Sequence, residues 1–386
     1  MKIFQRIKKS NGRTHIYICG IKIFSIKPNS FNGLLGVLWV PYINYRLQHC
    51  KYVHLMHNEK FTEATIQLFN NNFNPKDHLF LCASMPPFLK FPTAPNVIRL
   101  RSMKGLNFNQ KNIEKIICHG LFNPKVLDWL YKHPNISREK CFWVIWGGDL
   151  YGEYGDPEND QKYLSIRQNF KGYVSAFDKQ KACEMLHLDI SKFYTAFVSC
   201  PISKEMIEKV HKEKHDYIQI QINHSCNKTT LEMLDILSKW KDKNIHVSTV
   251  LSYGDLSCIE QIKQKGKGIF GDRFSYLERM VTPQEYTQFL AQNDILILNH
   301  DRQQGMGNAF VALNFGTKLF IKSDVSTYHF FNEEEKIKVF DTYLIKNMTF
   351  DEFVAYPEKE KNSKTASKYQ DEVYLAGLWR DVLNSN

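Results

Sequence analysis

The stretch that decides the fold is Asn293-Asp294-Ile295-Leu296-Ile297-Leu298-Asn299-His300-Asp301-Arg302-Gln303-Gln304-Gly305-Met306-Gly307-Asn308-Ala309. Its apolar run has the length and boundaries of a buried strand. A polar turn with two glycines follows, and residues 309–315 have helical character. Glycines at such a junction let backbone N–H groups approach a ligand closely, and a helix N-terminus favours anions. Because Arg302 adds a planar cation suited to phosphate, the stretch predicts a diphosphate site. A plain connecting turn is the alternative.

The length and composition predict a two-domain protein of the cytoplasm. The chain has 386 residues, of which 43% are hydrophobic, and this length exceeds what one core usually serves. It contains no apolar run long enough to span a membrane, and its first residues lack the apolar segment of an export signal. The nine cysteines show no CxxC and no metal-ligand spacing, so we expect reduced thiols.

Positive charge is concentrated before the first acidic residue, Glu59. The same segment contains an apolar run with Trp and Tyr, residues 33–43, and a basic stretch beside these aromatics suits an anionic lipid surface. We therefore predict association with the inner face of the cell membrane. A core element flanked by solvated lysines is the alternative, and nucleic acid is disfavoured because no recognised binding module accompanies the charge. The basic residues are Lys2, Arg6, Lys8, Lys9, Arg13, Lys22, Lys27, Arg46 and Lys51.

Two successive sets of alternating strands and helices follow a basic β-hairpin, which we place at residues 14–27 with its turn at Gly20. Such alternation predicts parallel sheets with helices on both faces, an α/β fold. The predicted divisions are an appendage (1–51), a first domain (52–203), a second domain (204–345) and a helical tail (346–386). The predicted strands are 52–56, 78–82, 115–119, 140–146, 172–176, 193–198, 217–223, 245–251, 268–270, 295–298 and 318–321; the predicted helices are 61–70, 124–131, 229–240, 256–265, 282–293 and 371–383. Residues 204–216 are an interdomain helix or linker, and 359–368 a loose tail.

Ligands of open α/β sheets lie at the carboxyl ends of the strands. Polar residues directly after predicted strands are therefore the candidates for chemistry. They are Glu59, His119 and Asp149 in the first domain, and Asn223, Ser225 and the turn 302–308 in the second.

Two motifs in these positions resemble a known family. Trp146-Gly147-Gly148-Asp149-Leu150-Tyr151 and Arg302-Gln303-Gln304-Gly305-Met306-Gly307 are similar to motifs of the TDP-4-acetamido-4,6-dideoxygalactose (Fuc4NAc):lipid-linked-intermediate transferases of enterobacterial common antigen assembly. Gly148 departs from that pattern, which has alanine there. Asn223 and Ser225 match an Asn-Ser pair of the family without its neighbouring glycines, and residues 374–379 are also similar. The likeness covers residues 52–383 in patches and leaves out the hairpin.

The resemblance implies a GT-B fold, in which two Rossmann-like domains face each other across a cleft. The nucleotide-sugar would bind the second domain and the acceptor the first. It also implies a glycosyltransferase that moves a Fuc4NAc-like sugar from a nucleotide-diphosphate donor to a polyprenyl-diphosphate-linked saccharide in surface polysaccharide synthesis. Such enzymes need no metal and no cofactor, since helix N-termini and basic side chains stabilise the departing diphosphate. Asp156 and Asp160 are too far apart to form an Asp-x-Asp motif.

The donor-binding hypothesis gives each residue of the turn a role. Arg302 contacts the diphosphate, Gln303 and Gln304 bind sugar or phosphate oxygens, Gly305 and Gly307 permit close approach, and Asn308 caps the following helix. Asn223 and Ser225 hold phosphate from the neighbouring strand end. The alternatives are an ordinary polar loop at 302–308 and a simple helix-start loop at 223–225.

Transfer with inversion needs a base that removes the acceptor hydroxyl proton. Asp149, His119 and Glu59 are the candidates. Asp149 could equally bind an acceptor hydroxyl or cap a helix, and His119 could be a structural histidine. A transferase acting on a soluble saccharide, one that adds pyruvate to a polymer, and a non-catalytic basic protein that binds lipid or nucleic acid are the competing functions.

Overall fold

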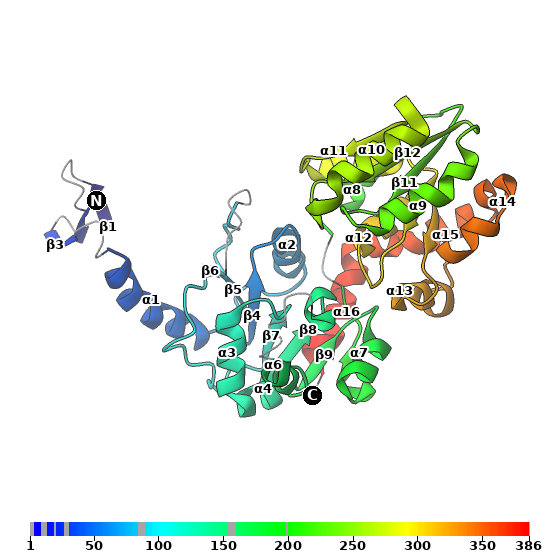
Figure 1. Cartoon of the computed structure of the whole chain (residues 1–386). Helices are drawn as coiled ribbons and strands as arrows, with labels where there is room; N and C mark the ends of the chain where they lie inside the picture. The colour runs from blue at the N-terminus through cyan, green and yellow to red at the C-terminus, as the bar shows by residue number, and fades with distance from the viewer. Residues whose placement is uncertain are drawn as a thin grey trace.

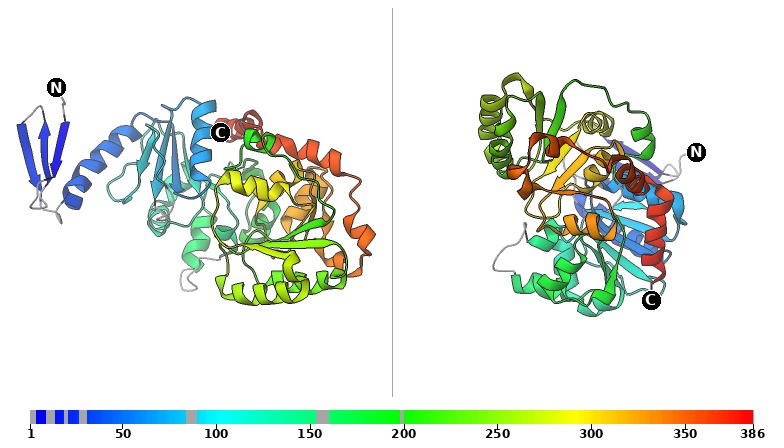
Figure 2. Two further views of the ribbon diagram at one scale, coloured as in Figure 1. Left: turned by 90° about the horizontal axis from the view of Figure 1, so that it is seen from above. Right: turned by 90° about the vertical axis from the view of Figure 1, so that its right-hand side faces the viewer.

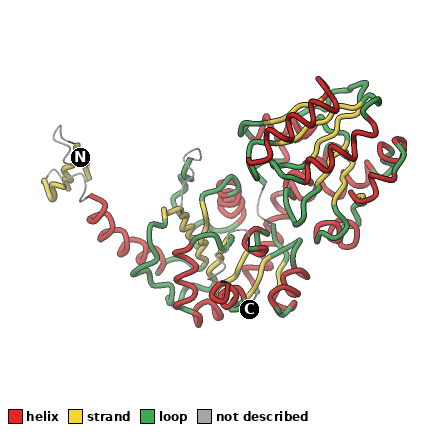
Figure 3. Tube along the Cα trace, viewed as in Figure 1, coloured by secondary structure: helices red, strands yellow, loops and turns green. Residues whose placement is uncertain are grey.

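The computed structural model describes residues 4–8, 14–18, 21–26, 31–83, 90–152, 160–197 and 200–385. Within these ranges the chain forms two parallel sheets flanked by helices, and a small antiparallel sheet near the N-terminus (Figures 1 and 3). We call the seven-stranded sheet with its helices the first lobe and the six-stranded sheet with its helices the second lobe. The α/β architecture with two Rossmann-like halves is as predicted.

The first lobe has the strand order β10-β9-β8-β7-β4-β5-β6, with every neighbouring pair parallel. Alternate residues of its strands enter two different cores: Phe80 and Cys82 pack on one face, Leu79 and Leu81 on the other. Burial on both faces explains why the strands read as continuous apolar runs. The elements are β4 (Tyr52–His57), α2 (Thr62–Asn72), β5 (His78–Ala83), β6 (Val97–Arg99), β7 (Lys115–His119), α3 (Pro124–Lys132), α4 (Pro134–Lys140), β8 (Cys141–Val144), α5 (Gly148–Tyr151), α6 (Asp160–Arg167), β9 (Gly172–Val174), α7 (Lys179–Leu186) and β10 (Phe193–Tyr194).

The second lobe has the parallel order β13-β12-β11-β14-β15-β16. Its helix α11 begins with the predicted capping box between Thr282 and Glu285, which satisfies two N–H groups of the first turn. The elements are α8 (Lys204–Glu208), β11 (Ile218–Ile222), α9 (Thr229–Leu237), β12 (Ile245–Val250), α10 (Ile259–Phe270), β13 (Phe274–Leu277), α11 (Pro283–Ala291), β14 (Ile295–Leu298), α12 (Met306–Asn314), β15 (Lys318–Ile321), α13 (Ser326–His329), β16 (Phe340–Asp341), α14 (Phe350–Val354) and α15 (Lys359–Ala366).

Two sequence predictions about local structure are wrong. Residues 268–270, predicted as a strand, end helix α10, and the strand follows at β13; a short apolar run does not distinguish the two. Segment 359–368, predicted to be loose, contains helix α15.

The appendage differs from the predicted hairpin. Strands β1 (Phe4–Lys8), β2 (Thr14–Ile18) and β3 (Ile21–Ile26) form a three-stranded antiparallel sheet, and the predicted turn at Gly20 lies outside the described residues. Helix α1 (Phe31–Leu47) follows. Figures 1 and 2 show this small sheet and α1 reaching away from the two lobes. The last turns of α1 join the first lobe, where Ile43 and Leu47 are fully buried.

The C-terminal helix α16 (Glu372–Asn384) leaves the second lobe and packs on the first (Figure 1). Trp379 is fully buried there; its Nε1 donates to the carbonyl of Phe197 over 3.0 Å, and its ring lies 5.0 Å from that of Phe69. The two lobes also share an aromatic cluster, in which the rings of Phe310 and Tyr369 stack at 3.8 Å. We propose a domain boundary between residues 203 and 204, with α16 assigned to the first lobe.

Candidate functional site

Each sheet has a point where the chain reverses the direction in which strands are added. In the second lobe this switch point lies between β11 and β14, and in the first lobe between β4 and β7. The loops at the carboxyl ends of such strands diverge and leave a crevice for ligands. The predicted donor residues follow β11 and β14; of the predicted bases, Glu59 follows β4 and His119 is the last residue of β7. The topology therefore places the candidates at the ligand-binding edges of their sheets.

Gly305 sets the geometry of the turn after β14. It is the N-cap of α12 with φ +74°, and no side chain caps the helix. A Cβ at this position would lie 2.3 Å from Cδ2 of His224, so only glycine fits. The first N–H groups of α12 have no carbonyl within the helix to bond to. The predicted cap, Asn308, is instead inside the helix and donates to the Tyr286 hydroxyl over 3.3 Å, so that prediction is wrong.

The two motifs predicted to act together meet across the two lobes. Gly147 has φ +88°, and a Cβ there would lie 2.7 Å from Oε1 of Gln303 and 3.5 Å from Nη1 of Arg302. Nη1 of Arg302 donates to the carbonyl of Gln303 over 2.8 Å, which folds the guanidinium back over its own turn. The turn 302–307 of the second lobe therefore lies against the 146–151 motif of the first.

Asp178, a residue of the first lobe, links the two lobes in the same region by hydrogen bonds. Its Oδ1 accepts from the hydroxyl of Tyr151 over 2.9 Å and from that of Ser326, in the second lobe, over 2.6 Å. Burial raises the pKa of Asp178, while these hydrogen bonds and the charge of Arg302 lower it. Asp178 thus lies close enough to Arg302 for the charges of the two side chains to interact at the boundary between the lobes.

Asn223 and Ser225, which follow β11 and were predicted to bind phosphate together, have different roles in the structure. Ser225 accepts a hydrogen bond from Nε2 of Gln304 over 2.9 Å, so the loops after β11 and β14 are joined. Asn223 is fully buried at φ +53°; its Oδ1 accepts from the N–H of Asn299, and its Nδ2 donates to Thr230. Its side chain is committed inside the protein, which favours support of the loop over the predicted contact with phosphate.

Two buried histidines were missed by the sequence predictions. The side chains of His224 and His300 are buried, and within the described structure Nε2 of His224 and both ring nitrogens of His300 lack a hydrogen-bond partner. Burial lowers the pKa of His300 to about 3 and that of His224 well below its usual value. Both follow strands at the switch point, which is the signal that could have identified them.

Lys60 is another cation of the region that the predictions did not include. Its Nζ lies 4.8 Å from the ring centroid of Tyr253, in the second lobe, and 5.1 Å from that of Phe61. Loss of hydration lowers the pKa of Lys60, with the neighbouring Glu59 opposing. The residue follows β4 and reaches across to the second lobe.

Asp149 is a poor candidate for the base in this geometry. Its carboxylate accepts three hydrogen bonds: from the N–H of Leu121 over 3.0 Å, from Nε1 of Trp143 over 2.6 Å and from the N–H of Trp146 over 2.9 Å. Burial raises its pKa and these donors lower it. A carboxylate so engaged organises the 146–151 motif, and we infer that this is its role.

His119 lies in a row of three buried histidines, together with His54 and His78. Its Nε2 is 3.0 Å from Nδ1 of His54, whose Nε2 is 3.0 Å from Nδ1 of His78. The ring of His119 also lies 5.8 Å from that of Trp379 on α16. Burial lowers its pKa to about 3. This packing in the core disfavours the predicted catalytic role.

Glu59 is the remaining predicted base. It follows β4 and is partly exposed, and its N–H donates to Oγ1 of Thr62 over 2.9 Å. Burial raises the pKa of its carboxyl, with Lys60 opposing. A carboxyl with a raised pKa at the ligand-binding edge of a sheet suits proton transfer near neutral pH.

The chain matches the family model described as 4-alpha-L-fucosyltransferase, glycosyl transferase group 56, over residues 101–348, which is more than half of its length. The chain belongs to glycosyltransferase group 56. The group 56 protein is therefore a glycosyltransferase, as the two motifs predicted. Its matched region includes both motifs and the whole sheet of the second lobe.

Solved structures share the fold of this group 56 enzyme. The Anabaena HepE protein in complex with UDP and glucose has a TM-score of 0.61 at 10% identity, over 87% of this chain and 100% of that chain. A Rickettsia africae glycosyltransferase has a TM-score of 0.58 at 12% identity, over 86% and 97%. Sucrose-phosphate synthase of Thermosynechococcus elongatus has a TM-score of 0.60 at 9% identity, over 87% and 100%. At these identities the likeness concerns the fold, and it agrees with the GT-B prediction.

The described residues offer neither a cluster of metal ligands nor a helix that could span a membrane. No group of three or more His, Cys, Asp or Glu side chains in the described ranges is placed to hold a metal ion. None of the helices described is both long and apolar enough to cross a bilayer.

One hollow of the group 56 protein, of about 600 Å³, lies apart from the two motifs. It lies on the first lobe between α3 and the loop 102–106, and three lysines line it: Lys104, Lys125 and Lys132. Asn44 of α1 donates to the carbonyl of Gly105 beside it over 2.9 Å. The hollow thus borders the appendage.

Proposed function

We propose that this group 56 enzyme transfers a Fuc4NAc-like deoxy or acetamido sugar from a nucleotide-diphosphate donor to a polyprenyl-diphosphate-linked saccharide. The observation that supports it most is the meeting of the Arg302 turn with Gly147 at the boundary of the lobes. The family description, which names a fucosyltransferase, supports a deoxyhexose donor. Sugar transfer requires donor and acceptor to meet between two binding surfaces, which this arrangement supplies.

The donor diphosphate is proposed to bind at the N-terminus of α12. The helix offers uncapped N–H groups and the positive end of its dipole, and Arg302 adds a permanent charge on the same turn. Gln303, Gln304 and Ser225 contribute polar contacts, and Gly305 and Gly307 allow the close approach. Charge that develops on the leaving diphosphate is stabilised by donors already oriented in the fold. The proposal therefore includes no metal and no cofactor.

The acceptor is proposed to bind the first lobe with Glu59 as the base. Of the three predicted bases, only Glu59 is neither held by several donors nor packed in the core. The raised pKa of its carboxyl favours proton uptake from a hydroxyl, and Lys60 beside it is placed to hold acceptor or donor oxygens. Glu59→Gln is expected to lose turnover and to keep donor affinity, which a titration with the donor checks.

The acceptor's lipid places the enzyme at the inner face of the membrane in this proposal. Tyr42 and Tyr45 of α1 are exposed by 46% and 58%, and aromatics of this kind occur at the membrane interface. The three lysines of the first-lobe hollow add positive charge next to α1. Vesicle flotation tests this: replacing Lys104, Lys125 and Lys132 by alanine should weaken binding to anionic vesicles, whereas replacing Lys214, Lys241 and Lys361 should not.

The decisive experiment compares two arginines. Arg302→Ala is expected to lower sugar transfer by about 100-fold or more, because an oriented donor to the leaving group is lost. Arg279→Ala is the matched control, since Arg279 is a surface residue whose side chain is 79% exposed and pairs with Glu285. Release of nucleoside diphosphate from a panel of deoxyhexose donors is the readout. Equal rates for the two variants would refute the assignment, and transfer to a soluble saccharide alone would refute the lipid-linked acceptor.

A further inference from the structure

We propose that His224 presents an Nε2–H group, in a tautomer fixed by its neighbours, to a phosphate oxygen of the donor at the N-terminus of α12. The inference rests on the proposed function, because it names a further contact of the same diphosphate. It is carried by a chain of hydrogen bonds that begins at the backbone of α11 and ends at the imidazole.

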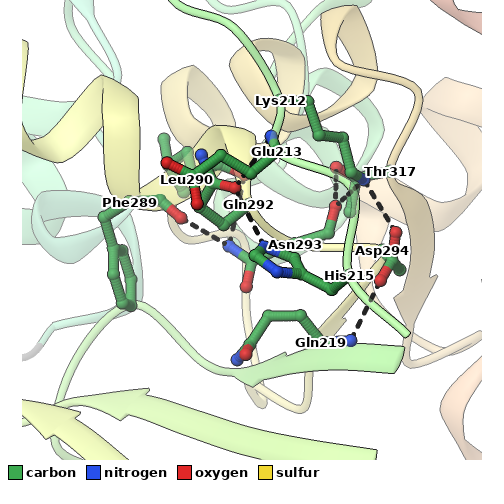
Figure 4. Close-up of polar contacts among 10 residues, drawn as sticks. All are labelled: Lys212, Glu213, His215, Gln219, Phe289, Leu290, Gln292, Asn293, Asp294 and Thr317. Atoms are coloured by element: carbon green, nitrogen blue, oxygen red, sulfur yellow. Dashed lines mark hydrogen bonds and ion pairs between the residues drawn. The ribbon is translucent and has the colours of Figure 1, made fainter. Parts of the chain in front are cut away.

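The chain begins with Asn293, whose amide orientation is set by carbonyl groups. Its Nδ2 lies 3.2 Å from the carbonyl oxygen of Phe289 and 3.3 Å from that of Leu290 (Figure 4). Only the NH2 side of an amide can face a carbonyl oxygen. The same Nδ2 donates to Oε1 of Gln221 over 2.8 Å. Gln221 is fully buried, and its oxygen is thereby identified as the acceptor.

The amide of Gln221 is therefore a donor toward His224. With Oε1 held by Asn293, its Nε2 donates to the carbonyl of Asn223 over 3.0 Å and lies 3.3 Å from Nδ1 of His224. An NH2 group at that distance can only donate. Nδ1 of His224 must therefore be unprotonated in order to accept from the Gln221 amide.

The second neighbour of Nδ1 is the hydroxyl of Tyr286, at 3.3 Å. This hydroxyl accepts from Nδ2 of Asn308 over 3.3 Å and can direct its own proton to Nδ1 of His224, which the Gln221 amide already requires to be an acceptor. Both neighbours are donors, and Nδ1 must be the acceptor. Because burial also keeps the ring neutral by lowering its pKa, its single proton resides on Nε2.

The protonated nitrogen faces the helix start. A Cβ at Gly305 would lie 2.3 Å from Cδ2 and 3.3 Å from Nε2 of His224, so this edge of the ring lies against the N-cap of α12. Nε2 is buried and has no acceptor among the described residues. A buried donor without a partner costs about 1–3 kcal/mol. That cost is relieved if a ligand oxygen takes the bond.

The chemistry of the surroundings selects an anionic oxygen. The N-terminus of α12 favours negative charge, and Arg302 and Lys60 add two cations nearby. His224 is covered by the Gly305 turn, so a phosphate oxygen reaches Nε2 only when that turn opens. Gly305, at φ +74°, gives the turn this freedom. A pyrophosphate is thus the ligand that the position fits.

Nuclear magnetic resonance on the 15N-histidine-labelled protein reads the tautomer without disturbing the fold. The long-range 15N–1H pattern of His224, assigned with His224→Gln, is expected to show the proton on Nε2. Addition of inorganic pyrophosphate is expected to shift the Nε2 resonance. A proton on Nδ1, or a His224 signal that does not move at saturating pyrophosphate, would overturn the inference.

Two variants separate a contact from a structural role. His224→Gln keeps an amide N–H near the position of Nε2, whereas His224→Asn can only replace Nδ1. Titration with the nucleoside diphosphate that stabilises the wild type best, chosen from UDP, TDP and GDP, is expected to show about tenfold weaker binding for Asn. The Gln variant should stay within about threefold; tenfold corresponds to about 1.4 kcal/mol. Equal losses in both variants would indicate a structural role and refute the contact.

The outcomes distinguish this inference from the proposed function. If the wild type binds none of the nucleoside diphosphates, the proposed donor site itself fails. If the wild type binds one and Arg302→Ala weakens it while His224→Asn does not, only the inference about His224 fails.

Discussion

Single glycines control how closely the two motifs approach. Gly147 has φ +88° and ψ −64°, a backbone conformation that residues with a Cβ avoid, and the Gln303 amide occupies the space beside it. The sequence predicted that residues 147 and 302–307 belong to one site, because both follow strands. It did not predict that the side chains of Asn223 and Asp149 are hydrogen-bonded to other groups inside the protein. Hydrogen-bond partners that are distant in the chain cannot be identified from a sequence.

Gly147→Ala is expected to lower sugar transfer by about tenfold or more. The added methyl group would strain the backbone by about 1–3 kcal/mol and would lie 2.7 Å from Oε1 of Gln303, so the Gln303 side chain would have to leave its position in the site. Gly152→Ala is the control, since φ is +79° there as well but a Cβ meets nothing within 4 Å. Steady-state kinetics checks both. Equal activity of the two variants would show that the contact between the motifs is unimportant.

Capping signals and apolar periodicity predicted where helices occur better than they predicted where helices end. The capping box of α11 and the helix after Gly305 were predicted and are present. Helix α10 was predicted to stop too early, because Gly266 and Gly268 weaken the helical pattern and the apolar pair after them suits a strand. The structure explains one glycine: a Cβ at Gly266 would lie 2.4 Å from the ring of Phe274. Close packing of α10 on β13 thus requires a glycine at position 266. Glycine has a low helix propensity, so the same residue weakens the prediction of a helix.

Alanine at these two positions of α10 should have opposite effects. Gly268 is exposed, and a Cβ there meets nothing within 4 Å, so Gly268→Ala is expected to stabilise the protein by about 0.5–1 kcal/mol. Gly266→Ala is expected to destabilise it by about 1–3 kcal/mol through overpacking against Phe274. Urea unfolding followed by circular dichroism measures both. Destabilisation by both variants would contradict the packing described for α10.

At the scale of the whole molecule, the lobes are held together by residues far apart in sequence. Figure 2 shows the C-terminal helix beside the first lobe, and the cluster around Phe310, Tyr369 and Phe330 joins the two halves. Two lobes were predicted from two sets of strands. The return of α16 to the first lobe was not, because its amphipathic pattern reveals an apolar face but not the surface that covers it.

Buried histidines make the stability of the molecule depend on pH. Burial lowers the folded-state pKa of His78 to about 4 and those of His119 and His300 to about 3, whereas the unfolded chain titrates near 6.5. The unfolded state therefore binds protons first, so stability is complete above pH 6.5 and falls as the pH decreases. Each histidine contributes a slope of up to about 1.4 kcal/mol per pH unit.

Urea unfolding at pH 7.0 and pH 5.5 tests this dependence. The midpoint is expected to fall clearly at the lower pH, and less so in His78→Gln, which removes one of the neutral buried rings. His211→Gln changes an exposed histidine and should leave the pH dependence as in the wild type. An unchanged midpoint between the two pH values would contradict the burial of neutral imidazoles.

A crystal structure of the protein with its nucleoside diphosphate tests the central claim most directly. We expect the diphosphate at the N-terminus of α12, within hydrogen-bonding distance of the first N–H groups of the helix and of the Arg302 guanidinium, and facing Gly147. A diphosphate bound elsewhere, for example in the lysine-lined hollow of the first lobe, with the Arg302 turn unoccupied, would contradict the account.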